Sequence, residues 1–285
     1  MKKCDLHCHS VFSDGRRTPE ELIDLACAAD LGAIALTDHN TMEGTERFLK
    51  SAEGRIQAVA GCEISTEAYG QELHLVGLFW NPEKVELVQQ KLREQILRKE
   101  ESNRRTIERL AEAGYDLSYE EFLALSGEGS LNRVHIARYL MSKGIIKDVE
   151  EGFANLLSKK GGYYQEAEKL DFFEMLSVIT EAGGVSVWAH PLHRLDRDTC
   201  LRILGKAKAC GLDGAEAYYS TYTPEDTAFM LEQCKKYSLL ISGGSDFHGE
   251  NKPGLYLGVG YGDLVVPYEC YEKLEERARE KAKNC

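Results

Sequence analysis

Short runs of apolar and β-branched residues alternate along this chain with longer segments whose apolar residues recur at the spacing of a helical face. Seven of the runs predict strands, at residues 3–7, 33–37, 56–61, 73–79, 185–189, 214–218 and 239–243. Strands that alternate with helices are typical of parallel α/β folds. The pattern therefore predicts an α/β fold whose parallel strands are joined by helices.

Two of the connecting helices carry clear boundary signals. Thr18 and Glu21 have the spacing of a capping box, Pro19 suits a first helical turn, and Gly32 is expected to end this helix. A second helix is expected to end at the glycine pair that directly precedes the strand at 185–189.

One connection departs from this pattern. The chain between Gly61 and Leu73 is too short for a crossover helix, which needs a dozen or more residues. We expect a hairpin-like excursion there instead.

Residues 83–160 differ from the rest of the chain, because they carry helical patterns and no strand signal. One long helix is expected from residue 85 to Gly114, and shorter ones at 119–125, 134–143 and 149–157. We interpret residues 83–160 as a helical insertion that caps the substrate, and residues 1–82 and 161–285 as one barrel domain.

Composition limits the possible functions. The 285 residues are 43% hydrophobic, which is ample for a core, and the net charge is −12. That charge argues against an extended nucleic-acid surface, which needs clustered positive charge. No apolar run approaches the roughly 18 residues of a membrane span. Without an export signal near residue 1, the nine cysteines indicate reduced thiols in the cytoplasm.

The eight histidines are the main chemical signal. His7 and His9 are two residues apart on an expected strand, so both imidazoles face one side and Cys8 faces the other. Most of the other candidates follow the carboxyl ends of expected strands, where parallel barrels place their active sites. They are Asp14, His39, Glu63, His74, His190, Asp246 and His248. Imidazole and carboxylate groups together suit zinc, manganese or iron.

These residues lie in a series of motifs, which read DLHCHS, SDG, TDHN, GCEIS, ELHLVG, AHP and GSDFHG in chain order. With this series the sequence resembles the PHP family, named for polymerase and histidinol phosphatase. The resemblance runs from His7 to His248. It implies a distorted (β/α)7 barrel and a metal-dependent phosphoesterase whose site holds two to three divalent ions, manganese foremost, with iron or zinc as alternatives.

The resemblance also implies how the metal-binding residues are shared. One ion would be held by His7, His9, Glu63 and Asp246, and Glu63 would bridge to a second ion held by His74 and His190. A third ion would be held by Asp14, His39 and His248. The expected nucleophile is a metal-bound hydroxide, with no further catalytic residue. Asp38 either supports a ligand from behind or caps the segment that follows it.

The expected insertion contains the sequence LNRVHIAR, residues 131–138, which resembles the phosphate-binding motif of PHP members that act on nucleotides. Arg133 offers a planar fork to phosphate, His135 accompanies it, and a helix start near Asn132 would add backbone donors. An ordinary amphipathic helix with a solvated arginine is the plainer interpretation. Taken together with the barrel, the motif favours a small phosphorylated substrate.

The leading hypothesis is hydrolysis of phosphate monoesters of small nucleotides, such as a nucleoside 3′,5′-bisphosphate or AMP, and of 5′-phosphorylated short oligonucleotides. Histidinol-phosphate phosphatase is the alternative enzyme. A noncatalytic metal-binding module ranks third, because no ligand of the set is missing.

Overall fold

The computed structural model describes residues 2–126, 131, 133–158 and 160–284. The chain forms two compact units, one of Met1–Leu92 with Leu170–Cys285 and the other of Arg93–Lys169. The second unit starts and ends later than the insertion expected at 83–160. The second unit starts later than expected because Val88 and Leu92 pack in the core of the first unit.

The first unit is built on a sheet whose strand order follows the chain. Its strands are β1 (Lys3–Cys8), β2 (Leu31–Leu36), β3 (Gln57–Ala68), β4 (Gln71–Leu78), β6 (Val185–Trp188), β7 (Gly214–Tyr219) and β8 (Leu240–Gly244), and the two-residue β5 (Leu170–Asp171) pairs with β3. Backbone hydrogen bonds from Asp246 to His7 and from His9 to Phe247 join the two ends of the sheet. The expected distorted (β/α)7 barrel is confirmed.

The expected excursion after Gly61 is a hairpin of two long strands. β3 and β4 pair antiparallel from Gly61↔Leu78 to Ala68↔Gln71, and the turn passes through Tyr69 and Gly70, both with positive φ. The strand expected at 56–61 was too short, because β3 continues to Ala68. Past residue 61, polar residues occur on one face of β3 and hide the strand signal, while its other face stays buried. β4 also pairs antiparallel with β6, so β4 runs against the other main strands.

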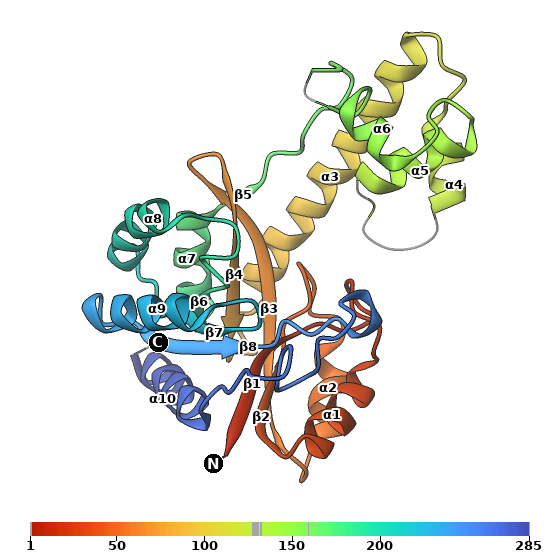
Figure 1. The fold of residues 1–285 in the computed structure, drawn as a ribbon. Helices are drawn as coiled ribbons and strands as arrows, with labels where there is room; N and C mark the ends of the chain where they lie inside the picture. The colour runs from red at the N-terminus through yellow and green to blue at the C-terminus, as the bar shows by residue number, and fades with distance from the viewer. Residues whose placement is uncertain (1, 127–130, 132, 159, 285) are drawn as a thin grey trace. The chain divides into compact units, whose positions relative to one another are not determined.

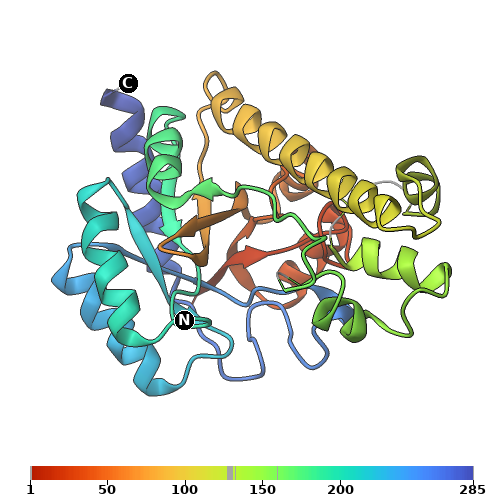
Figure 2. The same cartoon turned by 90° about the horizontal axis from the view of Figure 1, so that it is seen from above.

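Helices surround this sheet (Figures 1 and 2). They are α1 (Pro19–Ala28), α2 (Thr45–Ala52), α7 (Phe172–Glu181), α8 (Arg197–Ala209), α9 (Pro224–Lys236) and α10 (Tyr268–Asn284), with the short η1 (Gly249–Asn251). The capping box of Thr18 and Glu21 is present. The expected end of α1 at Gly32 was wrong. The helix stops at Ala28, and Asp30 with φ 54° makes the turn into β2.

A buried charge network ties α10 to the sheet. Asp213, directly before β7, accepts hydrogen bonds from the backbone N–H of Ser186, from Arg277 and from Lys281. Lys281 also donates to the carbonyl of Gly184 at 2.8 Å. The carboxylate of Asp213 is therefore satisfied by cations from α10, as burial requires.

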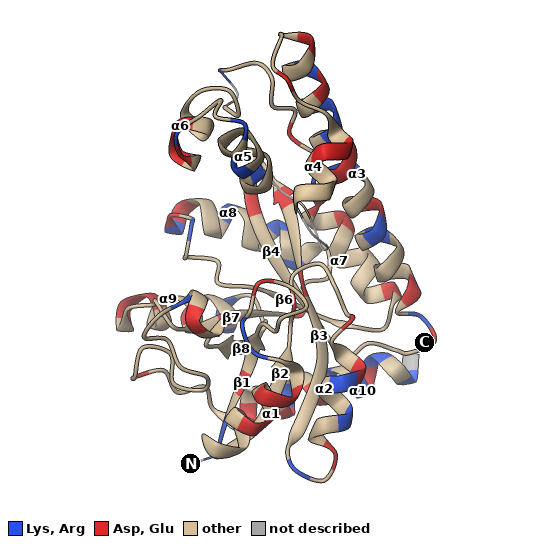
Figure 3. Ribbon diagram, turned by 90° about the vertical axis from the view of Figure 1, so that its right-hand side faces the viewer, with Lys and Arg blue, Asp and Glu red and all other residues tan. Residues whose placement is uncertain are grey.

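The second unit contains most of α3 (Glu86–Glu112), followed by α4 (Tyr119–Ser126), α5 (Arg133–Ser142) and α6 (Val149–Ala154). Among its described residues there is no strand. Ile107, Phe122, Ile136 and Leu140 lie in its own hydrophobic core. Lys and Arg alternate with Asp and Glu along α3 (Figure 3).

None of the helices in the described part of the chain is both long and apolar enough to span a bilayer.

Candidate metal centre

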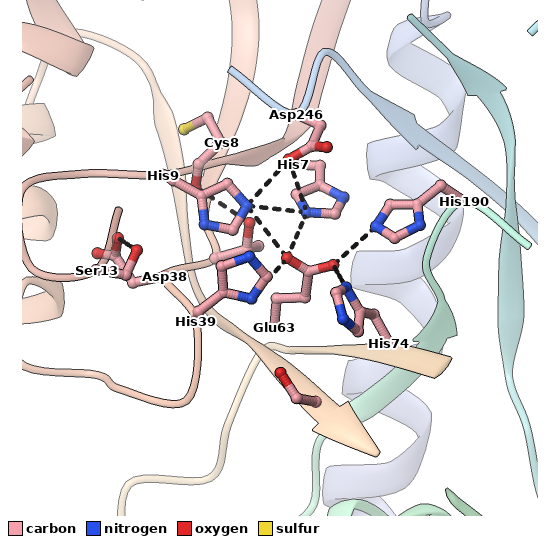
Figure 4. Close-up of polar contacts among 12 residues, drawn as sticks. His7, Cys8, His9, Ser13, Asp38, His39, Glu63, His74, His190 and Asp246 are labelled. Carbon is pink, nitrogen blue, oxygen red and sulfur yellow. Dashed lines mark hydrogen bonds and ion pairs between the residues drawn. The ribbon is translucent and has the colours of Figure 1, made fainter. Parts of the chain in front are cut away.

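Two histidines of β1 and its extension point into the site (Figure 4). The Nε2 atoms of His7 and His9 lie 3.2 Å apart, while Cys8 packs in the core beneath α1 and α2. Strand alternation explains this arrangement. Two nitrogens that each bind one ion at about 2.1 Å lie about 3 Å apart, so the separation of the two Nε2 atoms fits a shared ion.

Glu63 lies in the middle of the cluster because β3 continues past Gly61. Its Oε2 atom lies 3.2 Å from a nitrogen of each of His7, His9 and His39. Its Oε1 atom lies 2.8 Å from His74 and 2.9 Å from His190. The two oxygens of one buried carboxylate thus face two separate sets of imidazoles.

The hairpin explains why His74 reaches this site from the first half of its strand. β4 runs antiparallel to its neighbours, so its first residues lie at the edge where the parallel strands end. The Nδ1 atom of His74 faces Glu63, and its Nε2 atom lies 3.3 Å from Glu72. A carboxylate behind a metal-binding histidine commonly fixes the orientation of the ring.

Asp246 and His248 follow β8. Oδ1 of Asp246 lies 3.2 Å from His9 and 3.4 Å from His248. His248 lies 3.2 Å from Asp14, whose side chain is 55% exposed, so this side of the cluster opens to solvent. His39 is 3.9 Å from Asp14.

Two residues of the cluster have strained backbones. His190 has φ 31° and Asp246 has φ 55°, a region that residues other than glycine rarely adopt. The N–H of Asp246 donates to the carbonyl of His7 at 2.8 Å, and the N–H of His190 donates to Glu216 at 2.7 Å. Such strain persists where the surroundings hold it, and it concentrates at functional sites.

The geometry fits divalent ions. Three groups of nitrogen and oxygen atoms lie within 4.8 Å of one another, and they are His7, His9, Glu63 and Asp246; His9, Asp14, His39 and His248; and His39, Glu63 and His74. Among the described residues, His9 Nδ1, His39 Nδ1 and Glu63 Oε2 are buried and make no hydrogen bond of good geometry, although Glu63 Oε2 lies 3.2 Å from His39 Nδ1. Buried polar atoms rarely lack a hydrogen bond, so three such atoms in one cluster fit the role of metal ligands.

Electrostatics in the cluster couple imidazoles and carboxylates. Burial lowers the pKa of His9 and of His74, but the nearby carboxylates outweigh it and raise both pKa values to about 9. Burial also lowers the pKa of His7, but Glu216, Glu63 and Asp246 outweigh it and raise this pKa well above its ordinary value. Burial lowers the pKa of His39 to about 3. Without metal, the raised pKa values of His7, His9 and His74 therefore favour the protonated form of these imidazoles at neutral pH.

Asp38 does not contact the imidazoles in the hydrogen bonds that the structure describes. It accepts from the backbone N–H of Ser10 at 2.7 Å and from the hydroxyls of Ser10 and Ser13 at 2.6 Å. These bonds fix the loop between His9 and Asp14. Of the two expectations for Asp38, the contacts favour support of the site from behind.

The sequence did not single out two residues that touch the cluster. The carboxylate of Glu216 on β7 lies 2.8 Å from Nδ1 of His7, and Lys252 donates to Asp246 at 2.6 Å. A charged residue inside an apolar strand could have marked Glu216. Lys252 has no such local signal. Tyr219, the last residue of β7, also donates to Asp246, at 2.8 Å.

The phosphate-binding residues expected in the insertion lie in the second unit. Arg133, the first residue of α5, is half-buried, and its guanidinium stacks 4.5 Å from the ring centre of Phe153 and 4.9 Å from that of Tyr164. His135 is half-buried and two residues further along, so the two side chains do not share a helix face. Asn132 lies outside the described residues.

Comparison with known proteins gives consistent matches. The family model of the PHP domain matches residues 5–170. A 5′-3′ exoribonuclease of Haemophilus influenzae is 33% identical and covers 87% of this chain and 90% of its own. A phosphoribosyl 1,2-cyclic phosphate 1,2-diphosphodiesterase of Eggerthella lenta is 30% identical, with 86% and 94% covered. A 3′,5′-nucleoside bisphosphate phosphatase of Chromobacterium violaceum is 29% identical, with 90% and 91% covered.

A solved structure agrees with these matches. A protein of Bifidobacterium adolescentis, described as a metal-dependent phosphoesterase, superposes with a TM-score of 0.74 at 28% identity. The match covers 97% of this chain and 96% of that one, so it includes both units.

Proposed function

Because the chain belongs to the PHP domain family, we propose that it is a metal-dependent phosphoesterase that hydrolyses phosphate monoesters of small nucleotides and of short 5′-phosphorylated oligonucleotides. The observation that carries this proposal is the convergence of six histidines and three carboxylates, with buried unpaired atoms among them. Such a set suits two to three divalent ions, manganese foremost, with iron or zinc as alternatives.

The contacts support the following sharing of residues. His7, His9, Glu63 and Asp246 would hold one ion, and Glu63 would bridge to a second ion with its other oxygen, beside His74 and His190. Asp14, His39 and His248 would hold a third ion. His9 lies against this third group through its Nδ1 atom, 3.7 Å from Asp14.

Divalent ions at these positions would supply an activated water and polarise the phosphoryl oxygens. The chain's own residues would organise the rest. The bonds of Asp38 to Ser10 and Ser13 hold the loop of Asp14, and Lys252 and Tyr219 hold Asp246. The exposed side of the cluster, at Asp14, is where a substrate phosphate would enter.

The nucleotide preference rests on the second unit and on the relatives. The rings of Phe153 and Tyr164 fix the guanidinium of Arg133, and one of its N–H groups donates to the carbonyl of Leu157 at 3.5 Å. The other N–H groups of the guanidinium suit a phosphate. Three relatives have names that specify an RNA, a nucleoside bisphosphate or a phosphoribosyl cyclic phosphate. We therefore propose that Arg133 binds a phosphate group of the substrate.

A cytoplasmic location is part of the same proposal. The eight cysteines that the structure describes are free thiols, as a reducing compartment would keep them.

The decisive experiment is a hydrolysis screen with manganese that follows both released phosphate and released nucleotide or ring-opened product, run on the wild type and on Asp246→Ala. Substrates are AMP, nucleoside 3′,5′-bisphosphates, short 5′-phosphorylated RNAs, phosphoribosyl 1,2-cyclic phosphate and histidinol phosphate. We expect the nucleotides to be hydrolysed fastest and Asp246→Ala to be inactive. Wild-type rates from that variant, or full activity after exhaustive chelation, would contradict the metal-dependent mechanism, and a preference for histidinol phosphate would contradict the nucleotide assignment.

A further inference from the structure

Glu216 is a buried carboxylate that links two histidines of the cluster. It lies on β7, and its side chain is 1% exposed. Its Oε1 atom lies 2.8 Å from Nδ1 of His7, and its Oε2 atom accepts the backbone N–H of His190 at 2.7 Å. One residue thus contacts a histidine of β1 and a histidine that lies just after the end of β6.

From these contacts we infer that Glu216 is a positioning residue, which fixes the proton of His7 on Nδ1 and holds the backbone of His190 in place for metal binding. The inference rests on the proposed function, because it assumes that His7 and His190 bind metal.

The first part of the argument concerns the tautomer of His7. A neutral imidazole carries one proton, and an ionised carboxylate can only accept. The contact with Glu216 therefore places the proton on Nδ1 and leaves the lone pair on Nε2. Nε2 is the atom that lies 3.2 Å from both Glu63 and His9, so the lone pair points into the cluster.

The second part concerns the backbone of His190. Its φ of 31° is unfavourable for a residue with a side chain, and it directs the imidazole to Oε1 of Glu63, 2.9 Å away. A charge-assisted hydrogen bond from the N–H of His190 to Glu216 stabilises this conformation. Glu216 thereby acts on the residues of both ions that Glu63 would bridge.

Glutamine is the sharpest substitution, because it keeps the shape of the side chain and removes one acceptor. The amide has one oxygen for two donors. Whichever donor keeps the oxygen, the other then faces an NH₂ group. If that other donor is Nδ1 of His7, its proton must move to Nε2, which blocks metal binding. If it is the N–H of His190, the strained turn loses its support.

The test compares Glu216→Gln with Asp213→Asn. Asp213 is a buried carboxylate next to the opposite end of β7, and it contacts Ser186, Arg277 and Lys281 rather than the cluster. Zinc affinity is measured by competition with a chelator, without substrate. We expect Glu216→Gln to bind zinc about 10- to 100-fold more weakly. Asp213→Asn should be less stable but bind zinc like the wild type.

Histidine ¹⁵N spectra of the zinc-loaded wild type give a second measurement, which does not require the variant to fold. We expect the single ring proton of His7 on Nδ1. A proton on Nε2 would overturn the inference, as would unchanged zinc affinity in Glu216→Gln or an equal loss in Asp213→Asn. A wild type that binds no divalent ion would instead refute the proposed function itself.

Discussion

Two donors reach the same oxygen of Asp246. The hydroxyl of Tyr219 lies 2.8 Å from Oδ2, and the ammonium of Lys252 lies 2.6 Å from it. The other oxygen, Oδ1, faces His7 and His9. A carboxylate held at one oxygen can present the other in a fixed direction, so these donors orient Asp246 without entering the cluster.

Removing either donor should therefore lower kcat/KM, and the loss should be larger for Lys252 than for Tyr219. Lys252→Met removes a charge-assisted bond worth about 1.5–3 kcal/mol, so kcat/KM should fall about ten- to a hundredfold. Tyr219→Phe removes a bond worth about 1 kcal/mol, or roughly a fivefold loss. Because both share one oxygen, the double variant should deviate from additivity. Wild-type kcat/KM in Lys252→Met would show that Asp246 needs no such support.

Arg133 gives a second prediction for a single residue, namely selectivity among substrates. Arg133→Ala should lower kcat/KM about ten- to a hundredfold for a nucleoside bisphosphate, because one charge-assisted contact worth about 1.5–3 kcal/mol is lost. A simple phosphomonoester should be little affected. Arg133→Lys should restore only part, because lysine keeps the charge but not the fork. Equal losses for both substrates would show that Arg133 has a structural role, stacked between Phe153 and Tyr164.

Among the elements, α10 depends on a buried ion pair. Lys281→Met removes one of the two cationic side chains that donate to Asp213, and Arg277 remains. The free energy of unfolding should fall by about 1–3 kcal/mol, because an underpaired buried charge is costly. Lys283→Met is the matched control, since Lys283 is exposed on the same helix and should change stability by less than about 0.5 kcal/mol. Equal urea midpoints for the two variants would contradict a role for Lys281.

In the molecule as a whole, protons and metal ions compete for one cluster. Without metal, His9 and His74 have pKa values of about 9, raised from the ordinary value of 6.5. The folded protein then binds more protons than the unfolded chain between about pH 6.5 and 9. This contribution to stability is fully present below pH 6.5 and is lost as the pH rises to about 9.

The chelated protein should therefore become less stable from pH 6.5 to 8.5, while its affinity for divalent ions increases over the same range. Metal binding should release protons, because histidines bind metal in the neutral form. Denaturant unfolding with EDTA, and titration calorimetry in buffers of different ionisation enthalpy, measure the two effects. His74→Gln should reduce the pH slope. Metal binding without proton release at pH 7 would refute the raised pKa values.

The sequence by itself determined the elements and the candidate residues. Strand alternation separates His7 and His9 from Cys8, and the capping box of α1 requires only Thr18 and Glu21. These signals are local, because a period of two or a cap is set by residues within a few positions. The full barrel and the nine candidate metal-binding residues could be named from such signals and from the family resemblance.

The tertiary structure decided which side chains contact the metal-binding residues from elsewhere in the fold. The antiparallel direction of β4 brings His74 to the rim, and the pairing of β7 with β6 and β8 brings Glu216 to His7, 209 positions away in the chain. Tyr219 likewise reaches Asp246 from β7, whereas Lys252 follows Asp246 closely in the chain. No local pattern encodes such contacts, because they depend on the register of every strand between them and on how the sheet closes.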